Sequence, residues 1–281
     1  MPLIDRVLIV GTGFMGNALA NALYDNKIAD RIAGIEPNPQ FREQALGNDC
    51  YSEIESSLEQ IDFEPDLAVI CSPIETVVST AGQLFQRYKD MVITDIASVK
   101  RAIVDGVTGE LGQQSSRFVP AHPITGSDRT GPIQPPASIF TDRACVITRL
   151  ESNEDADVQL VDSMWSQLGS RVYYLSPDEH DLLLGMTSHM PHAVASALSA
   201  SLNEQELEFC GTGIRDTIRI AKSNPLLWKQ IFVQNRDSVL RAMDRFQDFF
   251  SQLRHALETD SVDELVSLLE KGQKNRDALG N

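Results

Sequence analysis

Apolar residues come in short continuous runs over the first two thirds of the chain, and each run gives way to a polar or glycine-containing turn. β-Branched residues are frequent in these runs, which is typical of strands buried on both faces of a parallel sheet. Seven such strands are predicted, at residues 6–10, 31–35, 67–71, 91–95, 117–120, 144–148 and 171–175. Helical stretches alternate with them, for example up to about residue 110 and over 158–168. The alternation predicts a doubly wound, mainly parallel α/β sheet.

The pattern changes at residue 176. Ser176-Pro177-Asp178-Glu179 is a capping box with proline at the first helical position, so a helix is expected to start there. No later run is typical of a strand. We therefore expect an α/β domain over residues 1–176 and an all-helical domain over residues 177–281.

One stripe of apolar residues stands out in the helical domain. Its members recur at intervals of four, three, four, three and four residues: Val239, Met243, Phe246, Phe250, Leu253 and Leu257. They lie in an amphipathic stretch over 225–258, and a helix of this length exceeds what a domain of roughly one hundred residues needs. The stripe fits a subunit interface built from exchanged helices and fits a central core helix equally well.

Composition narrows the classes of partner. The chain has 281 residues, 42% hydrophobic and 23% charged, which is ordinary for a globular protein with two cores. Its formal net charge of -16 repels nucleic acid and anionic membranes, so neither is expected as a partner, although a local basic pocket could bind a small anion. The four cysteines are far apart and form no C-x-x-C pair, which indicates a reducing cytoplasm rather than disulfides or zinc.

The first strand runs into a glycine-rich turn. Gly11-Thr12-Gly13-Phe14-Met15-Gly16 has the G-x-G-x-x-G spacing between a strand and a helix, which permits a tight turn and close approach of the backbone to a pyrophosphate. This register favours a folded segment over a signal peptide for the apolar stretch 7–23. Glu36 ends the second strand, 20 residues after Gly16, and its carboxylate can bind the ribose of adenosine and repel a 2′-phosphate. The sequence therefore predicts a dinucleotide site that prefers NAD to NADP.

Three further strand ends bring polar residues to the same edge of the sheet. Ser72-Pro73-Ile74-Glu75 follows the third strand as a second predicted capping box, Ser98 follows the fourth strand, and His122 follows the fifth. Pro123 disfavours helical geometry at His122, so the imidazole is expected in an extended or turn segment. Histidine exchanges a proton near neutral pH. A lone histidine beside a proline is more often a packed loop residue, but these neighbours favour a catalytic role.

Two histidines are predicted to share one face of a helix. His189 and His192 are three residues apart, and Pro191 loosens the helix between them by removing a backbone donor. No carboxylate or cysteine has the spacing that would complete a metal site, so no metal is expected. Contact with the substrate or the nicotinamide is the better interpretation.

A cluster of basic residues follows a flexible glycine segment. Arg215, Arg219 and Lys222 form the most plausible site for an organic carboxylate in so acidic a chain, since arginine binds carboxylates through two parallel hydrogen bonds. The alternative is that Asp216 pairs with one of the arginines and the cluster is structural.

Taken together, these motifs resemble the prephenate/arogenate (cyclohexadienyl) dehydrogenases of tyrosine biosynthesis. The resemblance rests on the order V-G-T-G-F-M-G, C-S-P-I, T-D-I-A-S-V-K, H-P-I-T-G-S, T-S-H-M-P-H and G-I-R-D-T-I-R-I-A-K-S-N-P-L-L-W, and it extends from residue 6 to about residue 236. It implies a Rossmann-like domain followed by a helical dimerisation domain, NAD(P) as hydride acceptor, and oxidative decarboxylation of prephenate or arogenate. The loop H-P-I-T-G-S departs from the commoner H-P-M-A-G and H-P-I-A-G forms, so Thr125 is expected to change the polarity of the pocket.

The resemblance also implies roles for individual residues. His122 corresponds to the catalytic histidine and Ser98 to the serine that assists it. The expected substrate-binding residues are Arg219, His192, His189 and Ser127. The expected cofactor-binding residues are Gly11, Gly13, Phe14, Met15, Gly16, Glu36, Ser72 and Pro73. We expect NAD as cofactor, dianionic prephenate or arogenate as substrate, and a cytoplasmic homodimer formed through the C-terminal helices.

Two other classes remain open on the sequence. The chain could be another reductase of this architecture, such as a β-hydroxyacid dehydrogenase or a pyrroline-carboxylate reductase, which are expected to rely on a lysine or on a different strand-end loop. It could also be a non-catalytic NAD-binding sensor, in which the fold persists but the histidine does not act.

Overall fold

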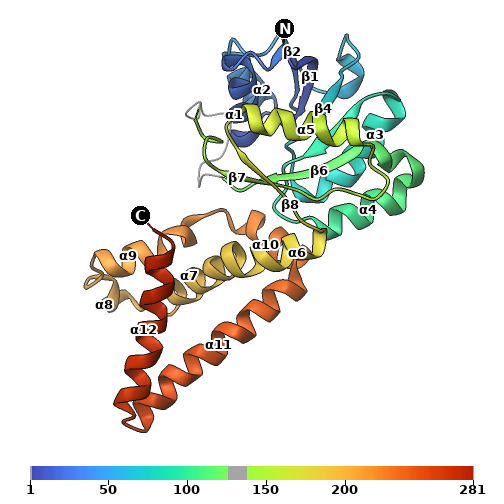
Figure 1. Ribbon diagram of the computed structural model, residues 1–281. Helices are drawn as coiled ribbons and strands as arrows, with labels where there is room; N and C mark the ends of the chain where they lie inside the picture. Colours follow the sequence, from blue (N-terminus) through green and yellow to red (C-terminus); the bar gives the residue numbers. More distant parts are fainter. Residues whose placement is uncertain (1, 126–137, 281) are drawn as a thin grey trace.

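The computed structural model describes residues 2–125 and 138–280. It has two parts: a sheet flanked by helices, and a second part in which every regular element of the described chain is helical (Figure 1). In the second part, α11 (Arg236–Glu258) and α12 (Val262–Ala278) project away from the sheet, and the chain turns back between them.

In the described part of the chain, eight strands form a single sheet in the order β3-β2-β1-β4-β5-β6-β7-β8. The strands are β1 (Ile4–Val10), β2 (Ala29–Ile35), β3 (Glu53–Glu55), β4 (Leu67–Ile70), β5 (Val92–Asp95), β6 (Phe118–Pro123), β7 (Ala144–Ile147) and β8 (Arg171–Tyr174). Neighbouring strands are parallel except β6 and β7, which are antiparallel. The predicted mainly parallel sheet is confirmed. It has one strand more than predicted, because β3 contains a single apolar residue, Ile54, and so gives no pattern.

The order of the strands reverses beside β1. From β1 the chain continues through β2 and β3 on one side and returns to the other side of β1 with β4. The carboxyl ends of β1 and β4 therefore flank the switch point at which doubly wound sheets bind their ligands. The glycine turn follows β1 and Ser72 follows β4, while β5 and β6 run parallel to them and end at the same edge.

Helices cover both faces of this sheet (Figure 1). They are α1 (Phe14–Asp25), α2 (Pro39–Ala45), α3 (Val77–Arg87), α4 (Arg101–Leu111) and α5 (Asp155–Gln167), with 3₁₀ turns at Leu58–Gln60, Ile74–Thr76 and Gly112–Arg117. α1 and α5 bury Leu23 and Trp165 in one hydrophobic cluster. α3 and α4 bury Leu84 and Ile103 in another. Each such side chain stabilises the fold by roughly 1.5–3 kcal/mol, so the two layers fix the strand ends that carry the candidate site.

The helical part begins with the capping box predicted at Ser176, which is confirmed. The Ser176 hydroxyl accepts the N–H of Glu179, and the Glu179 carboxylate accepts the N–H of Ser176. The helices are α6 (Pro177–Leu184), α7 (Met190–Ala200), α8 (Glu204–Leu207), α9 (Thr212–Ile218), α10 (Pro225–Gln234), α11 and α12. A π-helical turn (Gly185–His189) joins α6 to α7, so the predicted loosening of the helix near Pro191 is also confirmed. A 3₁₀ turn (Arg219–Lys222) follows α9.

The second predicted capping box, at Ser72, was wrong. The Ser72 hydroxyl shares a hydrogen bond of 2.8 Å with the Thr76 hydroxyl instead of accepting a backbone N–H. A 3₁₀ turn, Ile74–Thr76, separates Ser72 from the start of α3. Because that turn tightens the chain, the spacing of a capping box exists in the sequence without its geometry.

The predicted helical stretch over 225–258 is two helices rather than one. Asn235 interrupts it with φ of -109° and ψ of 33°. The side-chain amide of Asn235 donates to the carbonyl of Asp181 at 2.8 Å and lies 3.0 Å from Nδ1 of His189. A tertiary contact therefore replaces helical geometry at this residue.

The two parts of the molecule meet through α10 and the beginning of α4. Ile231 of α10 is buried in the hydrophobic cluster of α3 and α4, and Trp228 packs against that cluster. The backbone N–H groups of Lys100 and Arg101 donate to the two carboxylate oxygens of Asp181 at 2.8 and 3.0 Å. Apolar contact and charge-assisted hydrogen bonds thus hold the helical part against the loop that follows β5.

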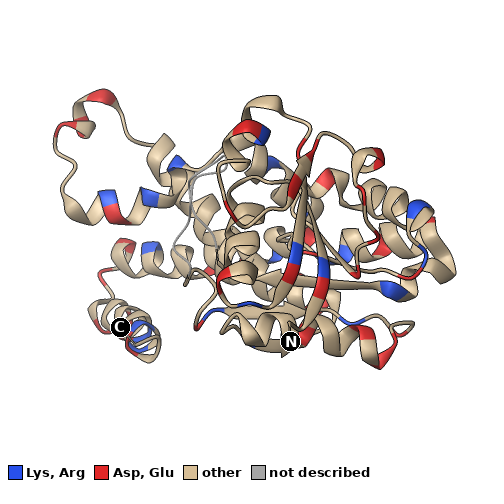
Figure 2. Ribbon diagram, turned by 90° about the horizontal axis from the view of Figure 1, so that it is seen from above, with Lys and Arg blue, Asp and Glu red and all other residues tan. Residues whose placement is uncertain are grey.

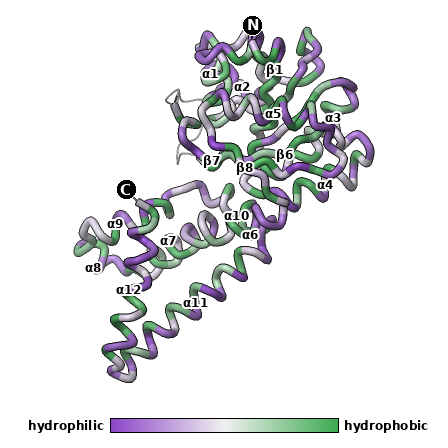
Figure 3. Tube along the Cα trace, in the orientation of Figure 1, coloured by the Kyte–Doolittle hydropathy of each residue, from purple (hydrophilic) through white to green (hydrophobic). Residues whose placement is uncertain are grey.

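Hydrophobic residues recur among hydrophilic ones along the projecting helices α11 and α12 (Figure 3). Phe246, Phe250 and Leu257 of the predicted stripe are 39%, 60% and 63% exposed, whereas Val239 is buried. The interpretation of α11 as a central core helix is therefore wrong for most of its length. Acidic residues are spread over both parts of the molecule (Figure 2). Among the described helices, none is long and apolar enough to cross a membrane.

Candidate functional site

The glycine turn between β1 and α1 is shaped by its backbone contacts. Gly11 has φ of +97°, and a Cβ there would meet the backbone of Cys71 at 3.0 Å. A Cβ on Gly16 would lie 1.9 Å from the carbonyl oxygen of Gly11. A Cβ on Gly13, in contrast, would meet no protein atom within 4 Å. The fold itself requires Gly11 and Gly16, while the open space at Gly13 fits the close approach of a pyrophosphate.

The residues that begin α1 add hydrogen-bond donors to this turn. Gly13 is the N-cap, and the first intrahelical bond runs from the N–H of Asn17 to the carbonyl of Gly13. The N–H groups of Phe14, Met15 and Gly16 precede it and have no partner within the helix. The helix N-terminus therefore presents donors to an anion at the switch point of the sheet.

Glu36 lies directly beside the glycine turn. Its Oε2 accepts the N–H of Thr12 at 3.1 Å, and its Oε1 accepts the N–H of Asn38 at 3.0 Å. The residue is buried. Each carboxylate oxygen has further acceptor capacity, so the side chain can bind a ribose hydroxyl while it also holds the turn. Its second role, in the fold, was not predicted.

Ser72 and Pro73 lie across the switch point from the glycine turn. They follow β4, which pairs with β1 in parallel register. The carbonyl of Pro73 accepts the Thr76 hydroxyl at 2.8 Å, which fixes the turn. The 3₁₀ turn that follows contacts α10 of the helical part. The predicted cofactor-binding residues therefore lie at the ends of three neighbouring strands, β2, β1 and β4, at one edge of the sheet.

A buried ion pair organises the loop that contains Ser98. Nζ of Lys100 lies 2.6 Å from Oδ2 of Asp95, and both side chains are 0% exposed. Asp95 also accepts the N–H of Ala97 at 2.9 Å and the N–H of Ala121 at 3.3 Å. The last of these bonds ties the end of β5 to the residue before the candidate histidine. Ser98 itself is half-buried, between Ala97 and Lys100 in the chain. Asp95 and Lys100 were missed, because their partnership depends on tertiary burial.

His122 is the buried histidine at the carboxyl edge. It pairs with Val146 of β7 and is 7% exposed. Its Nδ1 lies 2.8 Å from Nε2 of His180 in α6, and Nδ1 of His180 lies 2.7 Å from Oδ1 of Asp181. A line of three side chains thus runs from the sheet into the helical part. One feature of the sequence could have indicated these partners: His180 and Asp181 are adjacent, just after the capping box at Ser176.

The protonation states along this line follow from burial and hydrogen bonding. Burial lowers the pKa of His122 well below its ordinary value, and the neighbouring His180 and Lys100 add to the effect. Burial also lowers the pKa of His180, although the hydrogen bond to Asp181 opposes it. For Asp181 burial alone would raise the pKa, but hydrogen bonds from His180 and from the backbone of Lys100 and Arg101 outweigh it and lower the pKa. At neutral pH both imidazoles are neutral and the carboxylate is ionised.

His189 and His192 are held by contacts that the sequence did not reveal. His189 is buried, and burial lowers its pKa to about 4. His192 stacks on Trp228, with ring centroids 3.5 Å apart and 7° between the planes. Only the fold brings α10 beside α7, so Trp228 was not among the predicted site residues. Its ring fixes the orientation of His192 at the junction of the two parts.

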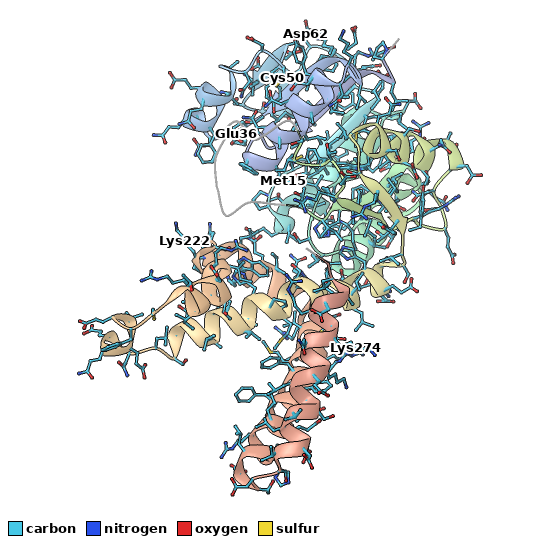
Figure 4. The ribbon with its side chains drawn as sticks, turned by 60° about the vertical axis from the view of Figure 1, so that its left-hand side comes forward. Met15, Glu36, Cys50, Asp62, Lys222 and Lys274 are labelled. Atoms are coloured by element: carbon cyan, nitrogen blue, oxygen red, sulfur yellow. The ribbon has the colours of Figure 1, made fainter. Side chains whose placement is uncertain are left out.

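The basic cluster is exposed. α9 ends at Ile218, and Arg219 begins the 3₁₀ turn, so Arg215 and Arg219 do not share one regular helix. Arg215 donates to the carbonyl of Cys210. The ion pairs of the described residues include neither Arg219 nor Asp216, which contradicts the structural alternative. Figure 4 shows Lys222 on the side of the helical part that faces the sheet domain near Met15.

The loop after His122 is described only in part. Ser127, a predicted substrate-binding residue, lies among residues 126–137, outside the described residues. The hydroxyl of Thr125 donates to the carbonyl of Ile139 at 3.1 Å. This bond occupies the hydroxyl proton, so the expected change in pocket polarity at Thr125 is reduced.

The site contains the parts of a redox enzyme that uses a dinucleotide. Across residues 2–125 and 138–280, no group of three or more His, Cys, Asp and Glu side chains is placed to hold a metal ion. A glycine turn at the switch point and a neutral buried histidine at the same edge define a dinucleotide-dependent dehydrogenase, in which the histidine can accept a proton while the cofactor accepts a hydride.

Comparison with known proteins defines the family. The family model described as "Prephenate dehydrogenase, nucleotide-binding domain" matches residues 19–174, and "Prephenate dehydrogenase, dimerization domain" matches residues 176–271. The chain belongs to the prephenate dehydrogenase family.

Similarity to known proteins extends over nearly the whole chain. The chain is 25% identical to cyclohexadienyl dehydrogenase of Zymomonas mobilis, over 99% of this chain and 97% of that one. It is 25% identical to prephenate dehydrogenase of Bacillus subtilis, over 98% of this chain and 76% of that one. The crystal structure of prephenate dehydrogenase from A. aeolicus, in complex with hydroxyphenyl propionate and NAD+, superposes with a TM-score of 0.92 at 31% identity, covering 98% of each chain.

Proposed function

We propose that this chain catalyses the NAD-dependent oxidative decarboxylation of prephenate to 4-hydroxyphenylpyruvate, or of arogenate to tyrosine, in tyrosine biosynthesis. The observation that carries the proposal is His122: a buried, neutral imidazole on the strand edge that also holds the glycine turn, in a chain that matches this family over both domains. Family membership argues against another reductase of this architecture and against a non-catalytic sensor.

The chemistry requires one base and a fixed orientation. NAD, when bound at the glycine turn, accepts the hydride from C4 of the cyclohexadienyl ring. His122 accepts the proton of the C4 hydroxyl as the C–H bond breaks, and Ser98 orients that hydroxyl. The ring carboxylate then leaves as CO₂, its bonding electrons complete the aromatic ring, and His122 returns the proton to the phenolate oxygen. Because aromatisation drives the reaction, orientation is the main contribution of the protein.

The remaining predicted residues are assigned to binding. Arg219 holds a carboxylate of the dianionic substrate, while His192, His189 and Ser127 line the ring pocket. The exposure of Arg219 and its lack of an ion pair among the described residues support this, since an arginine without an internal partner is available to an anion.

For the cofactor, Gly11, Gly13, Phe14, Met15 and Gly16 receive the pyrophosphate, with Ser72 and Pro73 opposite. Glu36 binds the ribose and selects NAD over NADP. The open space at Gly13 and the donors of the α1 N-terminus support these assignments.

We also propose a homodimer formed through the C-terminal helices, with the boundary between the two domains at residue 176. An apolar groove of about 650 Å³ lies between α7 and α11, lined by Met190, Ala193, Val194, Ala197, Leu198, Ser201, Met243, Phe246, Gln247 and Phe250. Exposed apolar surface of this kind is costly in water, and a second copy of the helices would cover it. The four free cysteines support a cytoplasmic location.

A spectrophotometric assay tests the proposed activity. NADH formation is measured with prephenate and with arogenate as separate substrates. We expect NADH with at least one of them and CO₂ release in equal amount. A folded protein that binds NAD but forms no NADH with either compound contradicts the proposal and favours the sensor.

A further inference from the structure

The line of side chains behind His122 crosses from one domain to the other. His122 belongs to β6 of the sheet, whereas His180 and Asp181 belong to α6 of the helical part. The His122 Nδ1 to His180 Nε2 distance is 2.8 Å, and the His180 Nδ1 to Asp181 Oδ1 distance is 2.7 Å. His180 is 0% exposed and Asp181 is 3% exposed. Buried polar atoms at these distances must match donor to acceptor, so each proton on the line has a determined position.

The Asp181 carboxylate determines which nitrogen of His180 carries a proton. Asp181 is ionised at neutral pH, and its Oδ1 and Oδ2 already accept the backbone N–H groups of Lys100 and Arg101 at 2.8 and 3.0 Å. An ionised carboxylate can only accept, so Nδ1 of His180 must carry the proton of the 2.7 Å contact.

The proton on Nδ1 of His180 determines the state of the second nitrogen of its ring. A neutral imidazole with a proton on Nδ1 has a bare Nε2, which can only accept. Nδ1 of His122 must therefore carry the proton of the 2.8 Å contact, and Nε2 of His122 is left with a free lone pair. The opposite orientation of the His180 ring would place carbons at both contacts and satisfy neither.

We propose that His180 and Asp181 are positioning residues that hold His122 in the tautomer whose Nε2 is the proton acceptor. This inference deepens the proposed function and rests on it for its catalytic consequence. Without the pair, His122 could carry its proton on Nε2, and that nitrogen would then donate to the substrate hydroxyl instead of accepting from it. The pair thus selects the reactive form of the base.

The arrangement also makes the base depend on how the domains are docked. Asp181 is fixed from the sheet side by the N–H groups at the start of α4, and its backbone carbonyl is fixed by the Asn235 amide. When His122 accepts the substrate proton, its Nδ1 continues to donate to His180, which in turn donates to the Asp181 carboxylate. The positive charge is then opposed by a negative group that the interface holds in place.

Nitrogen-15 NMR of histidine-labelled enzyme tests the tautomer without reference to activity. We expect His122 to show a protonated Nδ1 and a bare, pyridine-like Nε2 in the free enzyme at neutral pH. A signal for a protonated Nε2 on His122 overturns the inference. Since this measurement uses the unmodified protein, it does not depend on whether any variant folds.

Matched variants test the catalytic consequence. His180→Met keeps the size of the side chain but removes both hydrogen bonds, and we expect kcat to fall by roughly 10² to 10³ with little change in KM or in NAD affinity. His180→Gln restores an acceptor toward His122, so it should recover part of that loss. Asp178→Asn is the control, because it removes the exposed ion pair of Asp178 with Arg101 on the same helix and leaves the line of protons intact.

These outcomes distinguish failure of the positioning role from failure of the proposed function. Normal kcat in a folded His180→Met enzyme, or an equal loss in Asp178→Asn, overturns the positioning role. The expected tautomer together with no NADH from prephenate or arogenate would instead overturn the proposed function and leave the assignment of the protons in place.

Discussion

The two parts of the molecule treat apolar side chains in opposite ways. Among the described residues of the sheet domain the large apolar side chains are buried almost completely, and only Tyr24, Leu46, Tyr173 and Tyr174 are markedly exposed. Beyond residue 176 the exposed large apolar residues are Leu182, Leu183, Leu207, Phe209, Leu226, Leu227, Val233, Leu240, Phe246, Phe250, Leu257, Val262, Val266, Leu269 and Leu279. The sheet domain satisfies its own core, whereas the helical part leaves much of its apolar surface uncovered.

This difference indicates that the two parts have different roles. A domain with a complete core can hold cofactor and base rigidly at its strand edge. Helices with exposed apolar stripes are suited to association and to capture of substrate at a junction. Changes in the sheet domain should therefore act on turnover and cofactor, and changes in the helical part should act on substrate capture and assembly.

The largest expected effect is that of His122→Asn in the sheet domain. Asparagine keeps a polar side chain of similar length but has no usable base, so kcat should fall by roughly 10² to 10⁴. NAD affinity should be nearly unchanged, since the glycine turn is untouched. Steady-state kinetics measures kcat and cofactor titration measures NAD affinity, with His255→Asn as a control at an exposed histidine. Near-normal kcat in a folded variant would make His189 or His192 the next candidate for the base.

Arg219→Ala should show the complementary pattern in the helical part. Loss of a charge-assisted hydrogen bond to a carboxylate costs about 1.5–3 kcal/mol, so the KM for substrate should rise about 10-fold to 150-fold while NAD binding holds. Arg276→Ala is the matched control, because Arg276 is an exposed arginine of the helical part that donates to the Gly280 carbonyl and belongs to no proposed site. An unchanged KM in Arg219→Ala would show that the substrate carboxylate binds elsewhere.

Phe250→Glu tests the exposed stripe. We expect the apolar contact of Phe250 with the partner subunit to contribute at least about 2 kcal/mol to association. Placing a charge there should therefore weaken self-association by about 30-fold or more. Light scattering across a concentration series measures the mass. Leu46→Glu, in the sheet domain, replaces an equally exposed apolar residue, 58% against 60%, and should leave the mass unchanged. A wild-type monomer at micromolar concentration would remove the basis of this prediction.

Glu36→Gln should alter cofactor choice within the sheet domain. Removing the charge that opposes a 2′-phosphate should raise the kcat/KM ratio of NADP to NAD by roughly tenfold, equivalent to about 1.4 kcal/mol. The amide also replaces an oxygen that accepts from Thr12 or Asn38, so the melting temperature of the variant is measured in parallel. Equal use of both cofactors by the wild type would contradict the assigned role.

The smallest expected effect is a displacement of the acidic limb of the pH profile. The sequence alone suggests an ordinary histidine pKa for His122, but burial lowers that pKa, so the neutral base persists below the reference value of about 6.5. kcat/KM should therefore hold as pH falls through 6.5 and be lost only at lower pH. For His189 the folded-state pKa is about 4, so the unfolded chain binds more protons between these values and stability falls as pH drops from 6.5 to about 4. A limb at 6.5 would show that His122 is hydrated, and unchanged stability between pH 6.5 and 4 would contradict the lowered pKa of His189.

The sequence predicted those features that depend on local pattern. Continuous apolar runs predicted seven of the eight strands, and glycine spacing placed the dinucleotide turn. β3 was not predicted, because Glu53–Glu55 forms a strand through its pairing with β2 rather than through the pattern of its own residues. Asn235 ends α10 because of contacts with Asp181 and His189, which lie 54 and 46 residues away in the chain.

The candidate site shows the same limit more sharply. Residues proposed to touch a ligand were predicted from motifs, whereas the residues that support them in the fold were missed. His180 lies 58 residues from His122, and Asp181 lies 81 residues from Lys100. Separations of this size carry no periodic signal, so only the folded arrangement shows these partners.

The buried pair of Lys100 and Asp95 has a consequence for how such a sequence can drift. Burial lowers the pKa of Lys100 while Asp95 opposes that shift, and neither side chain is exposed. Replacing one partner would leave a lone charge in the interior at a cost of about 3–5 kcal/mol, whereas replacing both by an uncharged pair that keeps an acceptor at residue 95 for the N–H groups of Ala97 and Ala121 can be nearly neutral. Single-step ancestors between the two states would be poorly folded. Lineages should therefore exchange Asp95 and Lys100 together or keep both, and a double-substitution library should recover paired changes far more often than single ones.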